Sequence, residues 1–198
     1  MHTAKHEREE SGRDEKRLEN AVALRLLEQR TIMLAGEISR ESAQRVISQL
    51  LLLAEEDPAA PIKLFINSPG GDADAGYAIF DVVRFINVPV HMIAAGLAAS
   101  AAVIVLLASA KERRFSLPNA RFLIHQPSTG VRGSAADIQI EASEILKIRE
   151  KINKLIAGET GKTVEQIDAD TKRNFWMDAE QAKQYGLVGK VVASQEEI

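Results

Sequence analysis

The chain contains no cysteine among its 198 residues. Disulfide scaffolds, thiolate zinc sites and cysteine nucleophiles are therefore excluded. It also lacks a stripe of basic residues, and its formal net charge is −3, so the composition gives no footprint for nucleic-acid binding. The first residues contain no apolar segment and do not resemble a secretory signal.

One long stretch, Met92 to Ala110, contains no charged residue. A stretch of that length raises the question of a membrane span. Gly96 and Ser100 interrupt it, however, and its first third has the pattern of a strand. A buried strand followed by a buried helix explains the same hydropathy. We therefore expect a soluble, cytoplasmic protein with a sizeable core, in line with the 45% hydrophobic content of the chain.

The chain divides into three segments. Residues 1–17 are mostly charged or polar and predict a mobile N-terminal tail. Residues 18–192 predict a single folded domain, and residues 193–198 predict a frayed end. The tail holds His2 and His6, but no further cluster of ligands accompanies them. We therefore expect no metal and no cofactor in this chain.

Within the domain, segments with strand patterns alternate with segments of helical periodicity. We expect strands at 31–35, 62–66, 88–94, 121–125 and 187–192, helices at 18–30, 39–56, 73–85, 101–110, 135–157 and 178–185, and a short helix that opens with a capping box at 163–166. This alternation predicts an α/β fold with a largely parallel sheet. Right-handed crossovers then place the C-terminal ends of the strands at one edge, where the sites of such folds form.

Apolar stripes predict which side of each helix is buried. The stripe of the helix at 39–56 contains Val46, Ile47, Leu50, Leu51 and Leu53, and that of the helix at 18–30 contains Leu18, Val22, Leu24 and Leu27. The helix at 135–157 is too long for a compact layer and predicts a projecting arm suited to oligomer contacts. Its isoleucines, spaced for one buried face, are Ile138, Ile140, Ile145, Ile148, Ile152 and Ile156.

Ser100 stands where the apolar stretch changes from strand to helix. The first N–H groups of a helix lack internal partners, so they and the helix dipole can stabilise an oxyanion that forms beside a serine hydroxyl. Serine is also a favoured N-cap residue. Ser100 is therefore either a nucleophile or the cap of a core helix, and this stretch alone favours the cap.

His125 ends a strand at the same predicted edge. A histidine there could take the serine proton, although a single histidine at a strand end is more often structural. The turn Pro69-Gly70-Gly71 lies at this edge too, and its glycines allow the backbone to approach a ligand closely. The N–H groups of Gly71 and Ala101 could then bind an oxyanion.

Six motifs together resemble the ClpP family, the proteolytic subunits of ATP-dependent Clp proteases. They are Ile66-Asn-Ser-Pro-Gly-Gly71, Gly96-Leu-Ala-Ala-Ser100, Leu117-Pro-Asn119, Ile124-His-Gln-Pro127, Asp170-Thr-x-Arg173 and Tyr185-Gly-Leu187. The resemblance covers about Leu27 to Val192 in unbroken register. It implies a crotonase-like α/β fold with a projecting helical handle, here about residues 128–157. It also implies a homo-oligomer of two stacked seven-membered rings, a tetradecamer, around a closed chamber.

The resemblance further implies roles for residues and partners. Ser100 is the implied nucleophile, His125 the general base, and Gly71 and Ala101 the sources of the oxyanion N–H groups. An AAA+ unfoldase would dock on the ring and feed it unfolded polypeptide. That partner would consume the ATP.

Asn174 departs from the family pattern, because the third residue of the family's triad is an aspartate. Aspartate orients the histidine and stabilises the imidazolium that forms as serine attacks. Asparagine can accept a hydrogen bond from the ring but carries no charge, so we expect weakened intrinsic activity. Asp168 and Asp170 lie nearby in the sequence, where we expect solvated or capping acids.

Further departures concern the substrate groove and the assembly. Asp72 and Asp74 stand beside the groove, where the family mostly has small or apolar residues. Lys172 replaces an acid that, in the family, helps to pair the rings with Arg173. The segment before Leu18 lacks the apolar residues of the family's axial pore loops. A second, different ClpP-like ring as partner would reconcile these differences.

Three functions are consistent with these observations. The first is a serine endopeptidase subunit of a ring-shaped ATP-dependent protease, with low activity unless it is partnered. The second is a structural or regulatory ring subunit of a mixed assembly, with negligible catalysis. The third is an acyl-CoA enzyme of the crotonase fold, which we rank last because that class usually relies on glutamates rather than on a Ser–His pair.

Overall fold

The computed structural model describes residues 18, 20–128 and 130–198. The predicted tail, residues 1–17 with His2 and His6, lies outside the described residues. In the described part of the chain, no helix is both long enough and apolar enough to cross a membrane. The stretch from Met92 to Ala110 is instead a strand followed by a short buried helix, as its pattern predicts.

A mostly parallel sheet forms the centre of the fold. Its strands are β1 (Thr31–Ala35), β2 (Ile62–Ser68), β3 (Val90–Ala99), β4 (Arg114–Ser116), β5 (Arg121–Ile124), β6 (Phe175–Met177) and β7 (Lys190–Val191). The order is β1-β2-β3-β4-β7, and β5 pairs with both β3 and β6. Only the pairing of β5 with β6 is antiparallel within the described sheet. The α/β fold class with a largely parallel sheet is confirmed.

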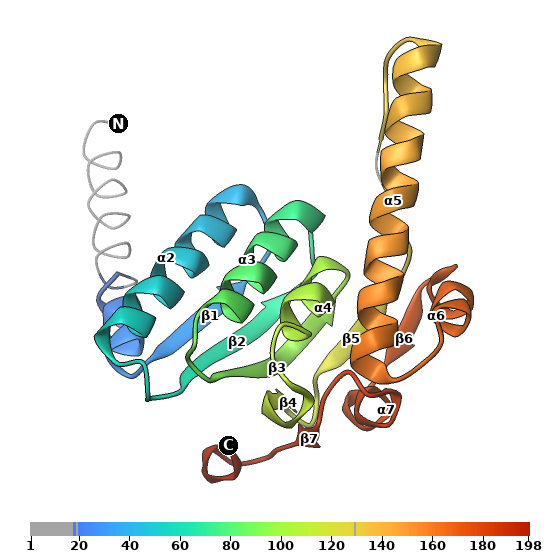
Figure 1. Cartoon of the computed structure of the whole chain (residues 1–198). Helices are drawn as coiled ribbons and strands as arrows, with labels where there is room; N and C mark the ends of the chain where they lie inside the picture. Colours follow the sequence, from blue (N-terminus) through green and yellow to red (C-terminus); the bar gives the residue numbers. More distant parts are fainter. Residues whose placement is uncertain (1–17, 19, 129) are drawn as a thin grey trace, which may run out of the picture.

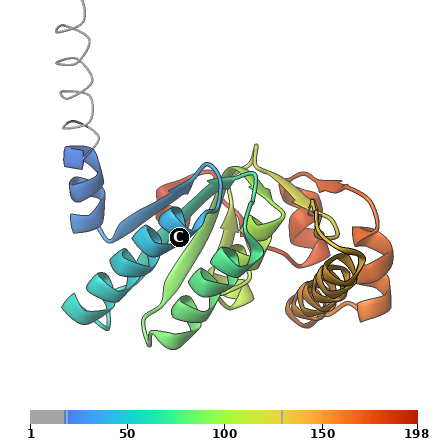
Figure 2. The ribbon, with the colours of Figure 1, turned by 90° about the horizontal axis from the view of Figure 1, so that it is seen from above.

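The helices are α2 (Arg40–Glu56), α3 (Ala73–Phe85), α4 (Ala101–Leu106), α5 (Ala135–Thr160), α6 (Val164–Thr171) and α7 (Ala179–Tyr185). Figure 2 shows α2 and α3 lying along one face of β1, β2 and β3. Leu64 of β2, Met92 of β3 and Leu50 of α2 meet in the core between these layers. The layered packing therefore holds the ends of the strands in a fixed arrangement.

Local signals explain where several helices begin and end. The Ser39 hydroxyl accepts a hydrogen bond from the Ser42 N–H and so starts α2. Asp178 and Gln181 form a capping box at the start of α7, and Gly186 in the left-handed conformation ends that helix. The predicted boundaries of these elements are confirmed to within a residue or two.

The central strand is longer than predicted. β3 continues through Gly96 to Ala99, whereas the sequence predicts a strand that ends before Gly96. Gly96 has a φ of 94°, and a Cβ there would lie 2.9 Å from the side-chain oxygen of Asn67. The register between β2 and β3 shifts at this point. The glycine therefore produces an irregularity inside the strand rather than its end.

The helix after Ser100 is shorter than predicted, because α4 ends at Leu106 instead of Ala110. The Arg84 guanidinium donates to the carbonyl oxygens of Leu107 and Ala108, at 3.3 and 2.6 Å. These bonds tie the two residues that follow α4 to α3. The chain then forms a 3-10 turn and β4, neither of which was predicted.

The predicted projecting arm is α5, which stands away from the sheet in Figure 1. Its apolar face is not uniformly buried, and that prediction is wrong for the outer half. Ile156 is 3% exposed, whereas Ile138 and Ile140 are 45% and 61% exposed. The outer half of the helix extends beyond the sheet and its helices, so it has little of this fold to pack against.

Other residues of the predicted stripes are also exposed: Leu51 of α2, and Leu18, Val22 and Leu24 near the start of the described chain. Val46, Leu50 and Leu53 of α2 are buried as predicted. The last residues, for which a frayed end is expected, form a 3-10 helix at Gln195–Glu197. Ile198 packs there against the small apolar cluster of Ile93, Phe115 and Val192.

Candidate active site

Ser100 lies between β3 and α4 in a strained backbone conformation, with φ 56° and ψ −121°. Positive φ is uncommon for a residue with a side chain and costs about 1–3 kcal/mol. Although Ser100 stands at the N-cap position of α4, its side chain makes no capping hydrogen bond in the described structure. The capping role therefore does not explain this serine. Sharp strand-to-helix turns of this kind present a nucleophilic hydroxyl to a cleft.

The turn after β2 packs directly against Ser100. Gly70 has a φ of 92°, and a Cβ there would lie 2.6 Å from the Ala99 carbonyl oxygen and 2.7 Å from the Ser100 Cβ. No side chain fits at that distance, so glycine permits the two turns to touch. The buried Ser68 hydroxyl holds the turn by accepting a hydrogen bond from the Gly70 N–H at 3.0 Å.

Backbone N–H groups are available on both sides of Ser100. The Ile38 N–H donates to the Gly70 carbonyl, and the Asp72 N–H donates to the Ile38 carbonyl, each at 2.8 Å. In this parallel bridge the N–H of Gly71 points away from Ile38. Ala101 is the first residue of α4, so its N–H has no acceptor within the helix. Gly71 and Ala101 both line the cavity that Ser100 lines.

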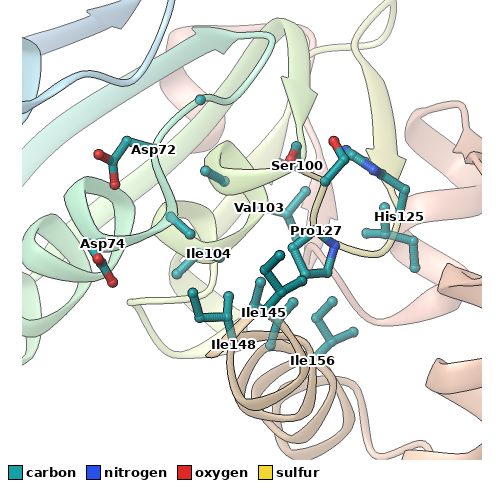
Figure 3. Close-up of a pocket in the computed structure, with 16 residues that line it drawn as sticks. Asp72, Asp74, Ser100, Val103, Ile104, His125, Pro127, Ile145, Ile148 and Ile156 are labelled. Carbon is teal, nitrogen blue, oxygen red and sulfur yellow. The ribbon is translucent and has the colours of Figure 1, made fainter. Parts of the chain in front are cut away.

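His125 directly follows β5, which pairs with β3 beside Ser100. The Ser100 N–H donates to the Leu123 carbonyl at 2.9 Å, which fixes the serine turn to this strand. Ser100 and His125 line one cavity of about 550 Å³, shown in Figure 3. Both residues therefore lie at one edge of the sheet, as the sequence predicts. The described contacts include no hydrogen bond between the Ser100 hydroxyl and the His125 ring.

Asn174 precedes β6, which runs antiparallel to β5. The last pair of the ladder is Ile124 with Phe175, so His125 and Asn174 are the residues next to that pair on the two segments. Beyond it the register changes, because the Gln126 N–H donates to the Thr171 carbonyl at 2.7 Å. Asn174 is exposed, does not line the cavity, and makes no described hydrogen bond to His125.

Two acids and a set of isoleucines lie on opposite sides of the cavity. Asp72 and Asp74 come from the start of α3, and Asp72 accepts a hydrogen bond from the Ala75 N–H as the cap of that helix. The other side consists of residues from α5: Ile145, Ile148, Ile152 and Ile156. Sequence reasoning missed these isoleucines as cavity residues, although their helical spacing marks a single stripe at the base of the arm.

Asp168 and Asp170 have structural partners instead of a place in the cavity. Asp168 accepts hydrogen bonds from Arg149 and Asn153. Asp170 accepts one from the Tyr185 hydroxyl at 2.7 Å. Burial and this bond raise the pKa of Tyr185. Neither carboxylate therefore supplies the charge that Asn174 lacks. Among the described residues, no group of three His, Asp or Glu side chains is arranged to hold a metal ion.

Comparison with known proteins gives consistent matches over most of the chain. The family model described as Clp protease matches residues 13–195. ATP-dependent Clp protease proteolytic subunit 2 of Treponema denticola is 48% identical over 180 residues, which cover 91% of this chain and 90% of that protein. Proteolytic subunit 3 of Rhizobium johnstonii is 47% identical over 176 residues, 87% of this chain and 89% of that protein.

A solved structure also matches, that of an Asn-to-Asp mutant of ClpP1 from Listeria monocytogenes. Its TM-score is 0.82 at 43% identity, and the match covers 88% of this chain and 98% of that chain. At this level of similarity the two proteins share the same fold over most of this chain.

Proposed function

The chain belongs to the Clp protease family, and on that premise we propose that it is a serine endopeptidase subunit in which Ser100 is the nucleophile. Family membership removes the acyl-CoA enzyme from consideration. The observation that carries the proposal is the backbone of Ser100. A strained serine, packed against Gly70 and with a hydroxyl not used for capping, lines the same cavity as a histidine.

In the proposed mechanism, the Ser100 Oγ attacks the carbonyl carbon of the scissile peptide bond. His125 accepts the serine proton and then gives it to the leaving amine. The Gly71 and Ala101 N–H groups donate to the oxyanion of the tetrahedral intermediate. Water then hydrolyses the acyl-enzyme, again with His125 as the base. The position of all four residues around one cavity supports these roles.

Asn174 is the proposed third member of the site. It would accept a hydrogen bond from the ring N–H of His125, and the register of β5 with β6 supports that pairing. An amide cannot stabilise the imidazolium as a carboxylate does, so the intrinsic turnover of this subunit is low. Catalytic hydrogen bonds are often long in unliganded sites and tighten when substrate binds.

The proposed substrate is an unfolded polypeptide delivered by an AAA+ unfoldase that docks on a ring of these subunits. The peptide would lie in a groove that passes Asp72 and Asp74, opposite the isoleucines of α5. The subunit itself needs no cofactor in this proposal. Pairing with a second, different ClpP-like ring would activate the subunit. It would compensate for the uncharged Asn174 and for Lys172, which disfavours the pairing of like rings. The cytoplasmic location stays a prediction from the sequence.

Labelling with a fluorophosphonate tests the proposal, because this probe reacts only with an activated serine. The assembled protein should be labelled at Ser100, faintly when alone and more strongly with a ClpP-like partner ring. The Ser100→Ala variant should give no label under either condition.

A second candidate function is a structural or regulatory ring subunit. The neutral Asn174 favours it, and so does the lack of a Ser100–His125 hydrogen bond among the described contacts. Absence of label at Ser100 both alone and with the partner ring would support this candidate and overturn the first.

A further inference from the structure

A partly buried polar cluster joins the base of α5 to α6, outside the cavity. It consists of Arg149 and Asn153 of α5 and of Asp168 and Thr171 of α6, and we call it the α5–α6 cluster. Figure 1 shows α6 and β6 beside the base of α5. Asn153 is 3% exposed and Thr171 is fully buried. A buried polar network of this kind favours one relative position of the helices that it joins.

Asn153 is the central residue of the α5–α6 cluster. Its Nδ2 donates to Asp168 Oδ1 at 3.0 Å, and its Oδ1 lies 3.3 Å from the Thr171 hydroxyl, whose proton it shares with another acceptor. Arg149 donates to the same Asp168 oxygen at 2.6 Å. A carboxylate only accepts hydrogen bonds, so Asp168 determines that the amide nitrogen faces it. The amide oxygen is thereby directed at Thr171.

Thr171 connects this cluster to the candidate active site. Its carbonyl oxygen accepts from the Gln126 N–H at 2.7 Å, immediately after His125. The next carbonyl, that of Lys172, accepts from the Gln126 side chain at 3.1 Å. Asn174 follows two residues after Lys172, immediately before β6, and adjoins the end of β5 that leads into His125. The segment that carries Asn174 is therefore held at Thr171, next to the histidine that it would support.

The fold of α6 does not itself need Asn153. The single proton of the Thr171 hydroxyl is shared: the Ile167 carbonyl within α6 accepts the shorter branch at 2.7 Å, and Asn153 Oδ1 accepts the longer one at 3.3 Å. Ile167 is fully buried in the main core and anchors the helix there. What Asn153 adds is a fixed placement of the end of α6 against α5.

From these contacts we propose that Asn153 is a positioning residue for the proposed peptidase reaction: through Thr171 it sets the placement of Asn174 relative to His125. The inference rests on the proposed function, because it concerns the same site. A displacement of about 1 Å in a catalytic group can cost on the order of 10²-fold in rate. The effect of losing Asn153 should therefore appear in the reactivity of Ser100 rather than in substrate binding.

The test compares Asn153→Leu and Thr171→Val with the matched control Lys154→Gln. Lys154 is the next residue of α5 and pairs only with Glu150 on the exposed side. The readouts are the rate of Ser100 labelling by a fluorophosphonate, kcat and KM for a fluorogenic peptide, and sedimentation of the particle. We expect Asn153→Leu to lower the labelling rate and kcat roughly 10- to 100-fold with KM within about twofold. Lys154→Gln should match the unmodified protein.

The double variant tests whether the two residues act as one unit. If Asn153 acts through Thr171, the double variant should lose no more labelling rate than the more impaired single variant. Fully multiplicative losses would overturn the proposal. So would unchanged labelling in a correctly assembled Asn153→Leu particle.

A substitution at Asp168 covers the case in which Asn153→Leu fails to assemble. Asp168 is half exposed, so Asp168→Asn should fold. It removes the charge that orients the Asn153 amide, and we expect a several-fold loss of labelling rate. An unchanged rate would overturn the proposal. Failure of the proposed function looks different, because the unmodified protein would then not be labelled at all.

Discussion

Single residues define the chemistry that this chain can perform. Ser100 and His125 were predicted to share an edge because each ends a strand of a parallel sheet, and they line one cavity. Asn174 adjoins the end of β5 that leads into His125 only because β6 pairs with β5 in the observed register. The positive φ of Ser100 and the contact with Gly70 have no signature in the residue pattern beyond the glycines themselves.

Restoring a carboxylate at position 174 should increase activity. We expect Asn174→Asp to raise kcat on a fluorogenic peptide, in assembled rings, by about 10²- to 10⁴-fold, because aspartate stabilises the imidazolium that forms during attack. The double variant Ser100→Ala, Asn174→Asp should be inactive and serves as control. An unchanged kcat would show that position 174 does not support His125.

Gly70→Ala should disable the serine turn. The new Cβ would overlap the Ala99 carbonyl and the Ser100 Cβ, at a φ of 92°. We expect a loss of Ser100 labelling and a destabilisation of about 2 kcal/mol or more. Gly158→Ala in α5 is the matched control, since a Cβ there meets no neighbour, and it should stabilise the protein by about 0.5–1 kcal/mol. Normal labelling of Gly70→Ala would refute the tight-turn argument.

Helices and strands depend on both local and distant signals. Asp178, Gly186 and Ser39 mark helix ends within their own turns, and these ends were predicted from the sequence. β4 and β6 were missed because each is only three residues long and is defined by its neighbours. The end of α4 was missed for the same reason, since Arg84 of α3 binds the carbonyls of the two residues that follow the helix.

The end of α5 is tied to the core by Glu159, which pairs with Arg84 of α3 and with Arg114 of β4 at 2.6 and 3.3 Å. Arg114 is buried, and burial lowers the pKa of its guanidinium while Glu159 opposes that shift. Glu159→Gln should lower the free energy of unfolding by roughly 2–3 kcal/mol, because it leaves a buried cation without its counter-charge.

Urea unfolding of Glu159→Gln beside Glu150→Gln measures this effect. Glu150 belongs to the same helix but pairs with Lys154 at the surface, where such a pair contributes about 0.5 kcal/mol or less. Equal destabilisation by both substitutions would contradict a special role for the buried pair.

For the molecule as a whole, assembly and overall stability matter most. α5 projects from the fold, and Ile138 and Ile140 are exposed on it. These isoleucines were predicted to be buried, and the fold of one chain leaves them uncovered. Assembly into rings is the proposed explanation for this surface.

A substitution at Lys172 tests whether two rings of this same subunit can pair. This lysine is exposed beside Arg173, where the family commonly has an acid. We expect Lys172→Glu to shift sedimentation from single rings toward double rings, because a positive charge is replaced by one that attracts Arg173 of the facing ring. Lys154→Gln, also on the surface, is the control. An identical distribution of species in both proteins would argue against this role.

Alkaline pH should destabilise the fold. Burial, with a smaller effect of Asp81, raises the pKa of Tyr77 to about 12, whereas a tyrosine in the unfolded chain ionises near 10. The stabilising contribution is therefore complete below about pH 10 and is lost as pH rises to about 12. Urea midpoints at about pH 9 and pH 11 should fall less for Tyr77→Phe than for the unmodified protein. Equal declines would contradict the assignment to Tyr77.

The sequence alone was enough to predict the alternation of strands and helices and the capped helix ends. It was also enough to predict that Ser100 and His125 lie at one edge of the sheet. These features depend on residues a few positions apart or on the handedness of crossovers, which the sequence pattern carries directly. Only the folded molecule showed that Asn174 adjoins the end of β5, that isoleucines of α5 line the cavity, and which groups Asp168 and Asp170 contact. These placements depend on register and on contacts between distant residues, for which a single sequence has no local signal.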